Sequence, residues 1–257
     1  DVLARAASLA GGPATISINW DAWAEVGMAV ETIARPKAAA ALKQAAEFKP
    51  VEHPLFQRCR AKGDEIHYVG TFSSEGPWLL TDHELYGKPT LPGTAYLEIA
   101  RSAFARHAAA ESYTFSDVFI LATFSVEPGQ PREIHVVLTK AGDGYDFTIK
   151  SPVAPGAEEW LEHSRGHIAA GTDQPRRTHD LVAMEARCTV EFHDVRAADK
   201  IVPGELRRQA DHLRVGARWM TPEWVRLGER EGVAAQRLGD AYVGDLVDFP
   251  LHPGLVD

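Results

Sequence analysis

Three segments that follow residue 53 alternate between apolar and polar positions. They span residues 66–72, 133–138 and 145–149. A period of two places successive side chains on opposite faces of a pleated strand, so each segment predicts a strand with one buried face. The sequence Gly142-Asp143-Gly144 lies between the last two segments and is typical of a hairpin turn. The pattern therefore predicts antiparallel strands in this part of the chain.

Residues 94–110 follow a different pattern, with Tyr96, Ile99, Ala100, Ala103 and His107 at helical spacing. Other apolar residues widen this stripe, which indicates a helix that is buried on most sides. The segment opens with Pro, Gly and Thr, and such residues suit a helix N-terminus. One buried helix among antiparallel strands indicates a sheet wrapped around a helix.

The C-terminal part begins a second passage of the same kind. Residues 186–192 alternate, residues 232–238 predict a further strand, and the chain then reaches 251–257. If the two passages are similar, His-Pro-Gly should lead into a second buried helix, and the second half is expected to be incomplete at Asp257. Near the N-terminus, residues 15–20 predict a buried strand, and residues 31–52 predict a linker with a short helix that Pro50 ends.

Composition narrows the class of protein. The 257 residues are 45% hydrophobic and 25% charged, as in ordinary globular proteins. Neither a signal peptide at the N-terminus nor an apolar run of about 18 residues is present, so no transmembrane helix is expected. The net charge of −9 argues against a nucleic-acid or anionic-membrane surface. Cys59 and Cys188 fit no metal-binding spacing and are expected to be reduced thiols in the cytoplasm.

His83 and Asp257 are the candidates for acid–base chemistry. His83 precedes a glycine-containing turn and the helix start at Gly93, where free N–H groups at the positive end of the helix could stabilise an enolate oxygen. Asp257 lies in an apolar run, and burial there would let it hold a proton near neutral pH. The alternatives are a strand-end histidine bonded to backbone and a solvated aspartate. His163 and His167 are four residues apart on a predicted strand, so no metal site is expected.

The region around His83 resembles the H-x-x-x-G-x-x-x-x-P signature of polyketide synthase dehydratase domains. His83, Gly87 and Pro92 stand at the required spacings. Residues 248–257 are similar to the family's second signature, in which the Asp after L-H-P-x-x-x is the catalytic acid. The resemblance extends over about residues 53–257 and includes three flanking segments, residues 53–56, 91–100 and 160–166. Residues 16–30 resemble the tail of a ketoreductase domain.

The resemblance implies an α+β double hot-dog fold, in which two antiparallel sheets each wrap a long central helix. The expected divisions are a ketoreductase-like tail (1–30), a linker (31–52), an N-terminal hot-dog (53–172), an inter-hot-dog linker (173–184) and the start of a C-terminal hot-dog (185–257). We expect a hydro-lyase that removes water from a 3-hydroxyacyl thioester, with His83 as the base and Asp257 as the acid. The expected substrate-binding residues are Gly87, Pro92, Gly93, Tyr96 and Val215.

The resemblance also implies partners but no metal or redox cofactor, because the substrate is carried on the phosphopantetheine arm of an acyl-carrier protein. Neighbouring synthase domains are further expected partners, and a homodimer stays open. Basic pairs at Arg176-Arg177 and Arg207-Arg208 are candidates for docking an acidic carrier, with solvated surface charge as the alternative.

One departure from the family leaves the reaction's outcome open. The family commonly has Tyr-Gly-Pro ahead of the second signature, whereas this chain has Val215-Gly216-Ala217. Loss of the phenol removes a polar group that could orient substrate or acid. Two alternatives therefore remain: a dehydratase that also cyclises or isomerises its product, and a non-catalytic dehydratase-like module.

Overall fold

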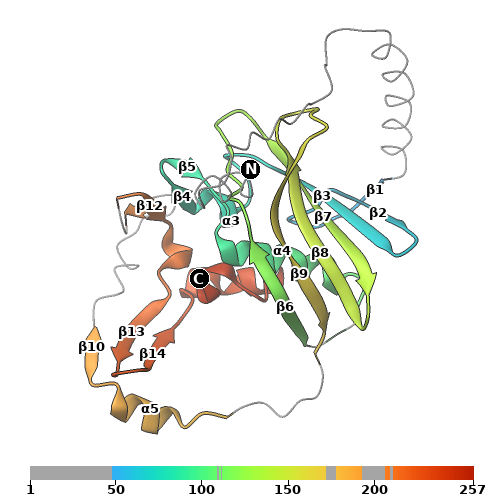
Figure 1. The fold of residues 1–257 in the computed structure, drawn as a ribbon. Coiled ribbons are helices and arrows are strands. Elements are labelled where there is room, and N and C mark those ends of the chain that lie inside the picture. Colours follow the sequence, from blue (N-terminus) through green and yellow to red (C-terminus); the bar gives the residue numbers. More distant parts are fainter. Residues whose placement is uncertain (1–47, 109, 111, 172–177, 193–205, 209–210) are drawn as a thin grey trace, which may run out of the picture. The chain divides into compact units, whose positions relative to one another are not determined.

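A computed structural model of the chain describes residues 48–108, 110, 112–171, 178–192, 206–208 and 211–257 (Figure 1). The strand expected at 15–20, the ketoreductase-like tail and Arg176-Arg177 lie outside the described residues. The expected linker at 31–52 is described only from Phe48.

The first half of the described chain forms a seven-stranded antiparallel sheet with the order β1-β2-β3-β7-β8-β9-β6. The strands expected at 66–72, 133–138 and 145–149 are all confirmed and are central in it. The strands are β1 (Lys49–Pro50), β2 (Arg58–Lys62), β3 (Glu65–Phe72), β6 (Tyr113–Ile120), β7 (Arg132–Ala141), β8 (Gly144–Pro152) and β9 (Trp160–Ala170).

Local sequence explains how the central strands pair. Ala141 of β7 is opposite Gly144 of β8, so Gly142 and Asp143 form a two-residue turn. Gly142 has φ +57°, a conformation that glycine adopts at little cost. The expected hairpin is therefore confirmed. Lys49 and Pro50, which fell in the expected linker, instead pair with Cys59 and Arg58 as an edge strand.

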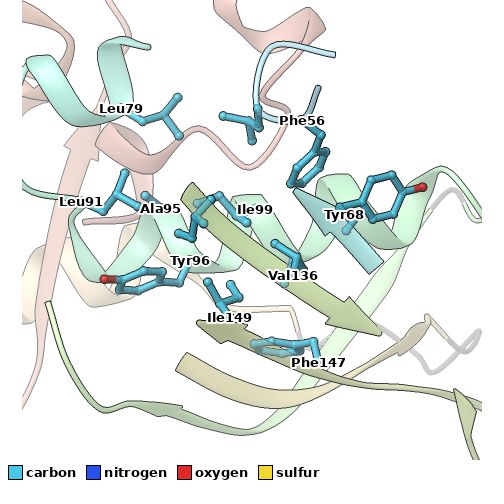
Figure 2. Close-up of a cluster of buried hydrophobic side chains, with 14 of the residues drawn as sticks. Phe56, Tyr68, Leu79, Leu91, Ala95, Tyr96, Ile99, Val136, Phe147 and Ile149 are labelled. Atoms are coloured by element: carbon cyan, nitrogen blue, oxygen red, sulfur yellow. The ribbon is translucent and has the colours of Figure 1, made fainter. Parts of the chain in front are cut away.

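Helix α4 (Gly93–Ala105) packs against β7, β8 and β9, and the sheet curves around it (Figure 1). Nine of its thirteen residues are buried, as the broad apolar stripe predicted. The helix ends five residues before the expected limit of 110. Figure 2 shows Ala95, Tyr96 and Ile99 of this helix packed with Tyr68, Val136, Phe147 and Ile149 from the strands. The expectation of a buried helix inside a sheet is confirmed.

Two smaller sheets contain the later residues. A four-stranded sheet has the order β11-β12-β4-β5 and so joins strands that are distant in sequence. A three-stranded sheet has the order β10-β13-β14. Their strands are β4 (His83–Leu85), β5 (Lys88–Pro89), β10 (Val190–Phe192), β11 (Arg207–Arg208), β12 (Leu213–Val215), β13 (Pro222–Leu227) and β14 (Gly232–Gln236).

The remaining elements are short helices. They are α3 (Trp78–Thr81), α5 (Leu181–Arg187), α6 (Pro253–Val256) and the 3₁₀ helices η2 (Ala217–Trp219) and η3 (Asp240–Val247). None of the helices in the described residues is both long enough and apolar enough to span a membrane.

One predicted strand is partly wrong. Residues 186–192 were expected to be extended, but Ala186 and Arg187 end α5, and only Val190–Phe192 form a strand. The reason is the side chain of Asp180, which accepts a hydrogen bond from the backbone N–H of Ala183 at 3.0 Å and caps the helix. The strand expected at 232–238 is confirmed as β14.

Candidate active site

His83 is the first residue of β4 and is 8% exposed. Its Nδ1 atom lies 2.8 Å from the carbonyl oxygen of Thr90. A carbonyl oxygen can only accept a hydrogen bond, so Nδ1 is the protonated nitrogen of the neutral ring, and Nε2 carries the lone pair. In the sequence analysis, a hydrogen bond to backbone was the alternative to a catalytic role for His83. In the structure, this bond selects the tautomer that a general base needs.

Burial lowers the pKa of His83 below its usual value, while the hydrogen bond to Thr90 and the negative charge of Asp257 act in the opposite direction. A lowered pKa keeps the imidazole neutral at pH 7. The charge of Asp257 acts on His83 although 174 residues separate the two in the sequence.

Gly87 belongs to the turn between β4 and β5. Leu85 is opposite Lys88, so Tyr86 and Gly87 are the two turn residues, with φ of +50° and +78°. Positive φ at both positions defines a type I′ turn, which favours glycine at the second position. The expected substrate-binding role of Gly87 is therefore replaced by a conformational one: it lets the chain reverse so that Thr90 can return to His83.

Helix α4 begins close to Asp257, because Thr94 in its first turn contacts that residue. Pro92 is the N-cap residue and makes no side-chain capping hydrogen bond. The first N–H groups of a helix have no acceptor within the helix, so the backbone at Gly93 can donate to a bound oxygen. A Cβ atom at Gly93 would come within 2.8 Å of Cδ1 of Ile120, so the Ile120 side chain lies close to the backbone of Gly93. The expected roles of Pro92 and Gly93 in substrate binding stay predictions.

Tyr96 has a different place from the one expected. It is 1% exposed, and its hydroxyl donates to the carbonyl of Ala122 at 3.1 Å and accepts from the N–H of Phe124 at 2.9 Å. These bonds occupy the phenol oxygen and fix the loop before Ser125. Tyr96 is therefore a core residue that holds a loop, and we correct its assignment as a substrate-binding residue.

Asp257 follows α6 and lies close to the first turn of α4. The hydroxyl of Thr94 donates to its Oδ1 atom at 3.4 Å. Asp257 is exposed, so the expectation that it is buried is wrong. The reason is that Asp257 follows the four-residue helix α6 and lines a pocket instead of packing in the core. The Thr94 contact places Asp257 at the first turn of α4, and its expected partnership with His83 as acid and base stays a prediction.

A pocket of about 420 Å³ is lined by Val215 and Asp257, whereas His83, Pro92 and Gly93 are not among its lining residues. Val215 lines it and pairs directly with His83 across β12 and β4, and Arg207 pairs with Val215 on the far side. Trp219 also lines the pocket, and its ring lies 5.8 Å from that of His83. The polar lining residues are Arg207, Arg208, Thr221, Gln236 and Asp257, so the pocket has polar as well as apolar walls.

Sequence reasoning did not identify Thr90 or Thr94 as part of this site, and it favoured packing for Trp219 over a place along the acyl channel. Thr90 acts through its backbone carbonyl, which no side-chain pattern reveals. Thr94 is one residue after the glycine of the helix start, and this position is the signal that could have identified it. Trp219 reaches His83 only because β12 pairs with β4, and that pairing joins residues about 130 apart.

The sequence of this chain is similar to those of known polyketide synthases. Residues 53–152 match the family model described as polyketide synthase dehydratase domain. Polyketide synthase ThaG of Burkholderia thailandensis is 32% identical over 217 residues, and PksM of Bacillus subtilis is 26% identical over 212 residues. These alignments cover 78% and 80% of this chain, but the chain spans only 4% and 5% of the two synthases.

Solved structures have the same fold. The dehydratase domain of the CurF module of curacin polyketide synthase superposes with a TM-score of 0.68 at 23% identity, covering 80% of this chain and 74% of that domain. A trans-AT polyketide synthase dehydratase domain from Brevibacillus brevis gives 0.67 at 24% identity, covering 81% and 72%. The α+β hot-dog fold is thereby confirmed. The family model, the related synthases and the shared fold together place this chain in the family of polyketide synthase dehydratase domains.

Proposed function

We propose that this chain removes water from a 3-hydroxyacyl thioester carried on an acyl-carrier protein, giving the α,β-unsaturated thioester. Membership of the family supports a dehydratase role in polyketide synthesis in general. The observation that carries the specific proposal is the Nδ1–Thr90 bond of His83. It leaves Nε2 of a neutral imidazole as a proton acceptor, beside the carboxyl group of Asp257.

The proposed reaction begins at C2 of the substrate. Nε2 of His83 takes the C2 proton, and the electron pair of that bond forms the C2–C3 double bond. The C3–oxygen bond breaks, and the hydroxyl leaves as water with a proton from Asp257, which is protonated once the bound acyl chain excludes water from around its carboxyl group. Each group moves one proton, so the elimination needs no other reactant.

The thioester group determines whether C2 can lose its proton. Negative charge gathers on the thioester oxygen as the C2–H bond breaks, and donors placed at that oxygen stabilise it. We assign this role to the backbone N–H groups at Gly93. Pro92 supports it by ending the preceding extended segment at the helix start.

A carrier protein would have to reach the pocket with its phosphopantetheine arm. Arg207 and Arg208 line the pocket, so the acidic carrier is proposed to approach from the side where β11 lies. The related synthases are far longer than this chain, which supports neighbouring synthase domains as further partners. No metal or redox cofactor enters the proposed chemistry.

The direct test is mass spectrometry of a synthetic 3-hydroxyacyl carrier protein after incubation with this protein. Loss of one water is expected for the wild type. His83→Ala and Asp257→Asn should each lower the rate by at least about a hundredfold, since general acid–base steps are typically worth 10²–10⁴-fold. An unchanged substrate with folded wild-type protein would favour the non-catalytic module.

The position of Val215 favours a second reaction outcome, in which the product is cyclised. This residue pairs with His83 and lines the pocket, where the family commonly has Tyr. A smaller side chain leaves room for a second hydroxyl of the substrate to add to the new double bond and close an oxygen ring. Incubation with a 3,7-dihydroxyacyl thioester separates the two, because a linear enoyl product alone contradicts cyclisation. A shifted double bond in that product would indicate isomerisation.

A further inference from the structure

Glu98 has a carboxylate that is fully enclosed in the protein, with an exposed fraction of 0%. An ionised carboxylate in the interior is stable only where donors surround it. Arg101 donates to it through Nε and Nη2, at 2.9 Å and 2.6 Å, and the hydroxyl of Ser102 donates at 2.8 Å. These contacts all lie within α4, so they explain how the charge is tolerated but not why it is needed.

A further donor comes from a distant part of the chain. The backbone N–H of Leu251 donates to Oε2 of Glu98 at 2.9 Å, across 153 residues of sequence. Leu251 directly precedes His252, the N-cap of α6, which makes no side-chain capping bond. A helix of four residues is far too short to be stable alone. Contacts from outside must therefore fix the place of α6.

The other end of the same segment also contacts α4. Thr94 donates to Asp257, the residue that follows α6. Thr94 and Glu98 are four residues apart in a helix, so their side chains lie on the same face, one turn from each other. One face of α4 thus contacts residues 251–257 at both ends of that segment. The first turn of α4 is also the part of the helix that faces the site.

We propose that Glu98 is a positioning residue that fixes residues 251–257 through the Leu251 amide and so sets where Asp257 stands relative to His83. The inference rests on the proposed function, in which Asp257 is the acid. Glu98 does not touch the substrate, because its carboxylate is enclosed. The competing explanation is that Glu98 only stabilises α4 through Arg101.

The test replaces the buried pair as a unit, with Glu98→Leu and Arg101→Met together. Apolar side chains in place of a buried ion pair are often neutral for stability, whereas removal of one partner leaves an unpaired charge. The Leu251 amide loses its acceptor in this variant. We expect the melting temperature to stay near that of the wild type, kcat to fall at least about tenfold, and KM to change little. Ser102→Ala is the matched control: it removes another donor to Glu98 but leaves the Leu251 contact, so kcat should be retained.

A second readout does not depend on turnover. The carboxylate of Asp257 raises the pKa of His83, so displacement of Asp257 should lower that pKa. NMR titration of His83 should give the same value in the double variant as in Asp257→Asn, and Ser102→Ala should match the wild type. An unchanged His83 pKa and kcat in the double variant would overturn the proposal. If that variant does not fold, Leu251→Pro decides in the same way, because proline has no amide hydrogen to donate to Glu98 and the Glu98–Arg101 pair stays intact. If the wild type dehydrates no carrier substrate, the proposed function fails, while the titration still tests the positioning.

Discussion

The imidazole of His83 combines a fixed tautomer with a lowered pKa. The Thr90 carbonyl fixes the proton on Nδ1, and burial disfavours the charged ring. With the opposite tautomer, Nε2 would carry the proton and could not accept another. The hydrogen bond to backbone is therefore compatible with the proposed role of His83 as a base, because it leaves Nε2 free to accept a proton.

The electrostatic effect of Asp257 on His83 gives a first prediction. Asp257→Asn removes a negative charge that raises the pKa of His83, so that pKa should fall further below its usual value of about 6.5. NMR titration of the ring without substrate measures the change. An unaltered or higher pKa in the variant would mean that the two side chains do not meet at one site.

His163 provides a prediction on stability, because it is completely buried between Ser151 and Ala122. Burial lowers its pKa to about 4. The unfolded chain binds a proton at about pH 6.5, but the folded protein binds one only near pH 4. The contribution to stability is therefore fully present above pH 6.5 and is lost as the pH falls toward 4.

The variant His163→Gln cannot take up this proton. Its free energy of unfolding, measured with urea between pH 6.5 and 4, should fall less steeply than that of the wild type, by up to about 1 kcal/mol per pH unit. Equal slopes for the two proteins would show that His163 is protonated alike in both states. The comparison of slopes is unaffected by a constant loss of stability from the substitution itself.

At the scale of elements, the two signature residues after His83 act through backbone geometry. Gly87 allows the type I′ turn, and Pro92 precedes the first turn of α4. The sequence alone could predict the strands and α4, because their periods of two and 3.6 are set by burial. It could not separate a substrate-binding Gly87 from a turn residue, since positive φ becomes visible only with the strand pairing. Similarly, the cap formed by Asp180 stabilises α5 as a helix, although the alternating pattern at residues 186–192 had predicted a strand.

Gly93 carries a prediction about the start of α4. Gly93→Ala should lower turnover more than stability, because the added methyl group stands where the thioester oxygen would approach its donors. The nearest atom to the new Cβ would be Cδ1 of Ile120 at 2.8 Å, and Ile120 is 56% exposed and can move. Rates with the carrier substrate and melting temperatures measure the two effects.

A matched pair of variants separates an effect of the added methyl group on the substrate from an effect of displacing Ile120. If the methyl group acts on the substrate, Gly93→Ala combined with Ile120→Ala should remain slow. Recovery of turnover in the double variant would instead show that displacement of Ile120 caused the loss. A large fall in melting temperature for Gly93→Ala alone would mean that glycine serves the backbone conformation.

At the scale of the whole described unit, the site forms where distant segments meet. The pairing of β12 with β4 brings Val215 to His83, and α4 brings Thr94 and Glu98 to the segment that ends in Asp257. The second signature placed Asp257 in the site by resemblance. The contacts that hold it there could not be predicted, because backbone groups such as the Leu251 amide leave no trace in a side-chain pattern.

Arg218 links two of the segments that meet at the site. Its guanidinium donates to Asp82 at 3.0 Å and to Asp245 at 2.6 Å, and it lies over the rings of Trp78 and Tyr242. Asp82 is the residue before His83, and Asp245 belongs to η3. The neighbouring Trp219 packs on the His83 ring. Arg218 therefore bridges the segment that contains His83 and the segment that leads to Asp257.

Arg218→Met should destabilise the protein by about 2 kcal/mol, because hydrogen bonds to charged groups contribute about 1.5–3 kcal/mol and partial exposure reduces that value. Arg218→Lys should recover little, since an ammonium group cannot form the planar bridge between two carboxylates or stack on the rings in the same way. Arg237→Met is the control: Arg237 pairs with Asp240 at the surface, with side chains 57% and 83% exposed, and such pairs are worth under about 1 kcal/mol. Urea unfolding measures all three. Equal losses for Arg218→Met and Arg237→Met would contradict the bridge, and full recovery by Lys would show that only its charge matters.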